Sequence, residues 1–182
     1  MALTSTMYTW ALELSDVDRG VYESLEVRMA MHPSESPEYF VARFLAYALE
    51  YAEGIGFSKG VSDPDDPTVS VRDLTGALTT WIEIGTPDAA RLHKASKAAR
   101  RVAVYVHKEP TVWLRQLAGE RIHKAEAIDI RVLDRELVDA LVEQLDRRMK
   151  CTVSVTDGTL FVDCGKGTLT GTVTPVRIGA DA

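Results

Sequence analysis

The chain has 182 residues, of which 46% are hydrophobic and 26% charged, and its formal net charge is −6. This length predicts one domain, residues 1–182, with a substantial hydrophobic core. The acidic balance excludes a generally basic nucleic-acid coat protein, although a local patch can still bind anions. Because no apolar run approaches the roughly 18 residues of a membrane span, no membrane partner is expected.

The N-terminal third is expected to form two strands and a helix. Residues 7–14 and 21–31 are rich in β-forming residues and flank a turn. Ser36 is a suitable N-cap for a helix that begins at the following proline and runs to about residue 53. Residues 57–68 are acidic and contain two prolines, and they are expected to form a loop. A solvated connector is the favoured interpretation of this loop, over a mobile flap.

The next stretch predicts a hairpin of strands 69–73 and 78–84. Strand alternation puts Trp81 and Glu83 on the same face of the second strand. A carboxylate in so apolar a strand is costly unless it is paired, hydrogen-bonded or bound to a metal. Glu83 is therefore a candidate functional residue.

A helix should follow, capped by Thr86, with five Lys or Arg residues between positions 91 and 101. A solvated helix face is the favoured interpretation for most of these cations. The apolar strand 102–106 comes next, and the helical connection predicts that it lies parallel to strand 78–84.

The C-terminal part predicts a helix at 111–117, a strand at 127–133, a helix from Asp134 to about 148, and a β-rich tail. Asp157-Gly158 is a strong signal for a two-residue hairpin turn. Its register sets Cys151 opposite Cys164 on one face. With two cysteines, no CxxC spacing and no secretion signal, we expect a cytoplasmic protein with both thiols reduced.

Asp73 and Glu83 are ten residues apart around a turn, and a fold that brings them together would suit Mg²⁺-assisted phosphoryl chemistry. Magnesium prefers oxygen ligands. The bound metal can activate water, and a nearby lysine can neutralise developing charge.

Four stretches match the pattern of a known family: HPSE at 32–35, DLTG at 73–76, WIEIG at 81–85 and PDAARLHKA at 87–95. The chain resembles the YaeQ family over essentially its full length. The resemblance implies an α+β fold: a compact PD-(D/E)XK nuclease-like core, with a mixed sheet flanked by helices and extra N- and C-terminal strands. It also implies a divalent-metal site, Mg²⁺ or Mn²⁺, but it does not establish an activity.

The nuclease pattern can be carried over residue by residue. Asp73 matches the first metal-binding acid and Glu83 the second. The pattern then requires a lysine two residues later, where this chain has Gly85. Some nucleases of this kind move the lysine to the following helix, which points to Lys94, with Lys97 as the second choice.

Some of these nucleases also use an acidic residue on the first helix at their active site. Glu38 matches this residue, with Glu35 as the second choice. Arg43 and Arg91 are candidates to bind phosphate or to pair with the acids.

Three functions remain open. The leading hypothesis is a metal-dependent hydrolase of nucleic-acid phosphodiesters. The rival is a catalytically inactive module that binds nucleic acid or a protein through the helix at 91–101. The third is a hydrolase of a nucleotide. The sequence leaves the substrate and the oligomeric state open.

Overall fold

The computed structural model describes residues 4–58, 63 and 65–180. The chain groups into two compact units. The first combines the N-terminal segment up to Val41 with Asp134–Val173, and the second combines Ala42–Leu133 with the residues from Thr174 on. Each unit is described by itself, and the expectation of one domain stays a prediction.

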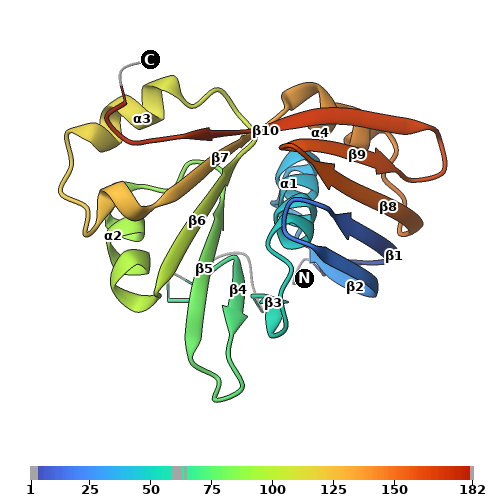
Figure 1. Cartoon of the computed structure of the whole chain (residues 1–182), viewed down its shortest axis with the longest axis horizontal. Helices are drawn as coiled ribbons and strands as arrows, with labels where there is room; N and C mark the ends of the chain where they lie inside the picture. The colour runs from blue at the N-terminus through green and yellow to red at the C-terminus, as the bar shows by residue number, and fades with distance from the viewer. Residues whose placement is uncertain (1–3, 59–62, 64, 181–182) are drawn as a thin grey trace. The chain divides into compact units, whose positions relative to one another are not determined.

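The first unit contains a mixed sheet with the strand order β2-β1-β8-β9-β10 (Figure 1). Strand β1 pairs antiparallel with β2 and parallel with β8, and the remaining pairs are antiparallel. The two long N-terminal strands confirm the expected hairpin. The bounds are β1 Thr6–Asp16, β2 Val21–Met31, β8 Arg148–Thr156, β9 Thr159–Asp163 and β10 Thr168–Val176.

The turn between β8 and β9 fixes the register of the C-terminal hairpin, as expected. Asp157 and Gly158 have φ of 51° and 70°, the left-handed pair of a type I′ turn. Thr152 lies opposite Asp163, so Cys151 faces Cys164. The structure joins these cysteines in a disulfide. The predicted register is confirmed, whereas the expectation of reduced thiols is wrong here, because it was drawn from the expected cytoplasmic location and not from the pairing of the strands. The cytoplasmic location stays a prediction.

Helix α4 (Arg135–Glu143) is shorter than expected. Asp134 caps it by accepting hydrogen bonds from the amides of Glu136 and Leu137. The expected continuation to residue 148 is wrong because Arg148 starts β8, where it pairs with Thr9 of β1. Sheet pairing overrides helix periodicity at this point.

The second unit contains another mixed set of strands, in the order β7-β6-β5-β4-β3. The first three are parallel neighbours, which confirms the predicted parallel pairing of β5 and β6, and β5-β4-β3 is an antiparallel meander. The α+β class with a mixed sheet flanked by helices is confirmed. The bounds are β3 Ile55–Phe57, β4 Val69–Arg72, β5 Leu78–Ile84, β6 Arg101–Val106 and β7 Asp129–Leu133.

Three further helices and a 3₁₀ turn complete the described elements: α1 (Pro37–Leu49), α2 (Ala89–Ala98), α3 (Thr111–Ala118) and η1 (Ala125–Ala127). Helix α1 starts in the first unit, where the Ser36 hydroxyl accepts from the Tyr39 amide as expected. It ends at Leu49 rather than near residue 53, because the chain turns there to form β3.

The core of the second unit lies where α2 and α3 pack on the sheet. Its buried members include Trp81 of β5, Leu92 of α2 and Trp113 of α3. Trp113 Nε1 donates to the carbonyl of Pro87 at 2.7 Å, which ties α3 to the start of α2. Among the described residues, no helix is long and apolar enough to cross a membrane.

Candidate functional site

Glu83 lies near the end of β5 and is only 4% exposed. Its Oε1 accepts from Trp81 Nε1 at 2.6 Å, as their shared strand face allows. The same oxygen accepts from Arg91 Nε at 3.0 Å and from a terminal nitrogen of Arg91 at 2.8 Å. Its Oε2 accepts from the Thr68 hydroxyl at 3.4 Å. The buried carboxylate is therefore paired and hydrogen-bonded within the protein.

Arg91 reaches Glu83 from the first turn of α2. The N-cap of α2 is Asp88, not Thr86, because the Asp88 carboxylate accepts from the Arg91 amide at 2.8 Å. The guanidinium lies 5.3 Å from the centre of the Trp81 ring, within cation–π range. It also donates to the carbonyl of Asp66 at 2.8 Å. Of the two roles expected for Arg91, pairing with an acid is the one observed.

The acidic segment before β4 contributes two carboxylates to this neighbourhood. Asp65 forms an ion pair with Lys94 of α2, and that hydrogen bond and charge lower the pKa of Asp65. Asp66 lies 3.5 Å from a terminal nitrogen of Arg72. Sequence reasoning treated this segment as a connector and missed both acids. The available signal was an acidic run close in sequence to a basic helix.

Asp73 lies at the other end of the β4–β5 hairpin. One of its carboxylate oxygens accepts from the Thr75 hydroxyl at 2.6 Å, from the Thr75 amide and from the Ala77 amide. The Thr75 hydroxyl bond is the main cause that lowers the pKa of Asp73. Leu78 and Glu83 are five steps apart along the strand, or about 17 Å. The structure thus brings Glu83 and Lys94 into one neighbourhood and leaves Asp73 outside it.

The other expected residues have simpler surroundings. Glu38 is half-buried in the first turn of α1, within the first unit. Glu35 is 8% exposed and accepts from the His32 amide at 3.1 Å. Arg43 lies over the Phe57 ring, and Lys97 is exposed on α2.

The backbone explains why position 85 holds a glycine and not the lysine that the nuclease pattern requires. Gly85 has φ of 85°, in the left-handed region that side chains disfavour, and its amide donates to the Tyr105 carbonyl at 2.9 Å. A lysine there would strain the end of β5. The absence of lysine at this position thus has a conformational reason.

A divalent metal needs several oxygen ligands that are free to face one point. Here both Glu83 oxygens accept hydrogen bonds from protein donors. One Asp73 oxygen likewise accepts hydrogen bonds within the turn at 73–77. Within 4–58, 63 and 65–180, no group of three or more His, Cys, Asp or Glu side chains could hold a metal ion. In this arrangement the residues do not fit a divalent metal; the metal role of Asp73 and Glu83 stays a prediction.

A second charged cluster lies on the opposite face of the same sheet. Arg101 of β6 donates to both oxygens of Glu50, at 2.5 and 3.0 Å, and to Asp129 at 2.7 Å. The Tyr105 hydroxyl donates to Glu50 at 2.6 Å. Burial first, and then the Glu50 charge, raise the pKa of Tyr105. Three of the cations expected on the basic helix face or just after it, Arg91, Lys94 and Arg101, are therefore ion-paired.

Comparison with known proteins decides the family. The family model described as YaeQ protein matches residues 1–173. The chain belongs to the YaeQ family. It is 30% identical over 172 residues to the "Uncharacterized protein YaeQ" of Escherichia coli strain K12, covering 93% of this chain and 94% of that protein. The Salmonella typhi protein of the same name is 29% identical over 171 residues, with the same coverage.

Solved YaeQ structures share the fold. The crystal structure of YaeQ protein from Pseudomonas syringae matches with a TM-score of 0.86 at 32% identity, covering 95% of this chain and 96% of that chain. The structure from Xanthomonas axonopodis pv. citri matches with a TM-score of 0.86 at 30% identity, covering 96% and 99%. The expected family is thus confirmed over nearly the whole chain.

Proposed function

We propose that this YaeQ-family chain is a non-hydrolytic module that binds nucleic acid through the C-terminal end of α2. One contrast carries the proposal. The acids that hydrolysis would need are occupied by internal donors, whereas Lys97, Arg100 and Lys124 are exposed. Among the described residues, none of these three cations forms an ion pair.

The chemistry of this surface suits phosphate. Lys and Arg side chains that neutralise phosphates supply the sequence-independent part of nucleic-acid binding. Hydroxyl groups also contact phosphate oxygens, and Ser96 lines the same pocket as Arg100 and Lys124. The surface is a local one, since the chain as a whole has a net charge of −6.

The test is anisotropy of a labelled single-stranded oligonucleotide in chelator, at several salt concentrations. Three phosphate contacts predict a slope of log affinity against log salt of about −2. Lys97→Gln and Arg100→Gln should each reduce the slope by about 0.7. Lys166→Gln, at an exposed lysine of the first unit, is the matched control and should leave it unchanged. Absence of binding at low salt would exclude the module.

The second candidate is an Mg²⁺- or Mn²⁺-dependent hydrolase of phosphodiesters or nucleotides. It is supported by the neighbourhood of Glu83, Lys94 and the 65–66 acids. Asp73 and Glu83 remain the proposed metal ligands, with Lys94 as an assisting group, and the assisting role expected for Glu38 stays a prediction.

Calorimetric titration of Mg²⁺ and Mn²⁺ into chelator-treated protein separates the two candidates. Saturable binding in wild type that is lost in Glu83→Gln while circular dichroism shows the variant folded, together with chelator-sensitive cleavage, would favour the hydrolase. The same titration of the Asp73→Asn variant tests whether Asp73 contributes to metal binding. Absence of metal binding and of cleavage in wild type would count against the hydrolase.

A further inference from the structure

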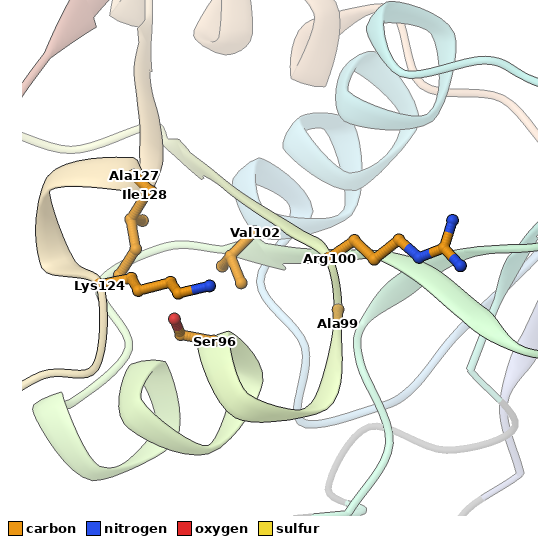
Figure 2. A pocket seen from close by; sticks show the side chains of 7 residues that line it. All are labelled: Ser96, Ala99, Arg100, Val102, Lys124, Ala127 and Ile128. Carbon is orange, nitrogen blue, oxygen red and sulfur yellow. The ribbon is translucent and has the colours of Figure 1, made fainter.

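A small pocket opens beside the C-terminal end of α2 in the second unit (Figure 2). Its volume is about 70 Å³, which exceeds the roughly 10–15 Å³ needed to hold one water. No Asp or Glu is among the lining residues, which are Ser96, Ala99, Arg100, Val102, Lys124, Ala127 and Ile128. The pocket therefore presents cationic and hydroxyl groups above an apolar floor.

Two polar groups face the same space. Figure 2 shows the Lys124 side chain extending above Ser96 with its amine toward Val102, and the Ser96 hydroxyl pointing into the same space, whereas the Arg100 guanidinium points away. Among the described residues, the Lys124 amine has no hydrogen-bond or ion-pair partner. The Ser96 hydroxyl donates to the His123 carbonyl at 2.6 Å. Its remaining lone pairs can accept, and its hydroxyl can rotate to donate to a ligand instead.

The backbone at Lys124 is unusual for a lysine. Its φ is 47°, and glycine would adopt this left-handed conformation without steric cost. Lys124 and Asp157 are the non-glycine residues with positive φ among those described, and Asp157 is explained by its hairpin turn. Such a strained position next to a pocket is an observation from which function can be inferred.

Neighbouring interactions hold the segment that carries Lys124. The His123 amide donates to His93 Nδ1 at 3.1 Å, and the Ser96 hydroxyl lies 3.1 Å from His123 Nδ1. Both His93 and Ser96 belong to α2. The bond to His93 ties the 123–124 turn to the helix even when the Ser96 hydroxyl rotates, so the backbone of Lys124 is held beside the pocket.

We propose that this pocket binds a phosphate group, with the Lys124 ammonium and the Ser96 hydroxyl as its ligands and Arg100 as a neighbouring cation. An ammonium and a hydroxyl both donate hydrogen bonds to phosphate oxygens. The helix carbonyl end disfavours an anion, and the two cations offset this effect. The site goes beyond the proposed nucleic-acid module, because a phosphate group can occupy it without a polymer or a metal.

Two sources could supply the phosphate: a free phosphate or monoester, and a phosphodiester of a nucleic-acid backbone. The first arm of the test titrates inorganic phosphate at constant ionic strength and follows amide NMR shifts of the pocket residues. The second arm uses an oligonucleotide without terminal phosphates. Both arms are run on wild type, Lys124→Gly and Ser96→Ala.

Lys124→Gly removes the amine and suits the backbone, so the variant should fold normally. Phosphate affinity should fall about tenfold in Lys124→Gly and about threefold in Ser96→Ala. Lys166→Gly removes an exposed lysine between two glycines of the first unit and should change nothing. Lys124→Arg retains the positive charge and should largely retain binding.

A response to inorganic phosphate that Lys124→Gly weakens supports the site and assigns a small phosphate. A response to the oligonucleotide alone, weakened in the same way, supports the site and assigns a backbone phosphodiester. No response in either arm overturns the proposal, as does binding that Lys124→Gly leaves unchanged. Because the first arm contains no nucleic acid, its success does not depend on the proposed function.

Discussion

Replacement of Glu83 by glutamine should destabilise the protein strongly. The Glu83 side chain is 6% exposed and that of Arg91 is 23% exposed, so the change leaves a largely buried guanidinium without its counter-charge. Removal of one partner from a buried ion pair costs about 3–5 kcal/mol. Because Arg91 retains some solvent and two backbone carbonyls as acceptors, we expect about 3 kcal/mol, at the lower end of that range.

The assay is urea and thermal unfolding, followed by circular dichroism and by tryptophan fluorescence. A loss of about 3 kcal/mol corresponds to a decrease in Tm of about 6–12 °C for a chain of this size. Arg91→Met and the double variant complete a double-mutant cycle. The double variant should be less destabilised than the sum of the single variants, by about 1–3 kcal/mol.

Wild-type stability in Glu83→Gln, within about 0.5 kcal/mol, would refute this reasoning. A variant more stable than wild type would refute it more strongly. It would mean that the Glu83 carboxylate lowers the stability of the protein, as expected of a residue that serves to bind a ligand. In that case the hydrolase candidate would gain support. Asp73→Asn is the matched carboxylate control, since Asp73 is exposed in its turn and should contribute less.

Four further predictions concern other residues. Hydrogen bonds from the amides of Gly158 and Asp157 lower the pKa of Asp18, so its stabilisation is present above about pH 4 and lost as the pH falls through the folded-state value. Asp18→Asn should accordingly reduce the loss of stability on acidification, measured by urea unfolding. The pKa of Tyr105 is raised, so its phenol favours folding near neutral pH and this contribution is lost at high pH. In the folded protein Tyr105 should therefore remain a neutral phenol near pH 10, and Tyr105→Phe should leave the tyrosinate absorbance at that pH unchanged. Thiol titration of denatured, unreduced protein should find no free Cys151 or Cys164; reduction should cost about 3 kcal/mol for this loop length. Gly85→Ala should cost about 1–2 kcal/mol in unfolding experiments.

Local signals predicted much of the fold. The Asp157-Gly158 turn set the hairpin register, and the Ser36 cap located the start of α1. Both depend on residues within a few positions of one another, and for this reason they can be read from sequence. The predicted C-terminal ends of α1 and α4 were wrong, because these helices end where the chain enters strands that pair with distant segments.

The candidate site was predicted only in part, for a related reason. Strand alternation correctly put Trp81 beside Glu83. The distance along the hairpin was the missing information: a turn brings the residues that flank it together, whereas Glu83 is at the far end of β5. The position across from Glu83 is Thr68, next to the acids at 65 and 66. A count of strand residues outward from the turn would have indicated this.

The backbone at Gly85 connects the two candidate functions. A lysine on the strand, two residues after Glu83, would need an extended conformation there, but the chain leaves the strand at a φ of 85°. The turn sends the chain into α2, and the first turn of α2 carries Arg91 to Glu83. A cation from the helix is thereby placed against the Glu83 carboxylate. Unlike lysine, an arginine bound through two nitrogens has a rigid fork. Arg91 is therefore suited to hold the Glu83 carboxylate in place, and a carboxylate held by protein donors favours the binding module over the hydrolase.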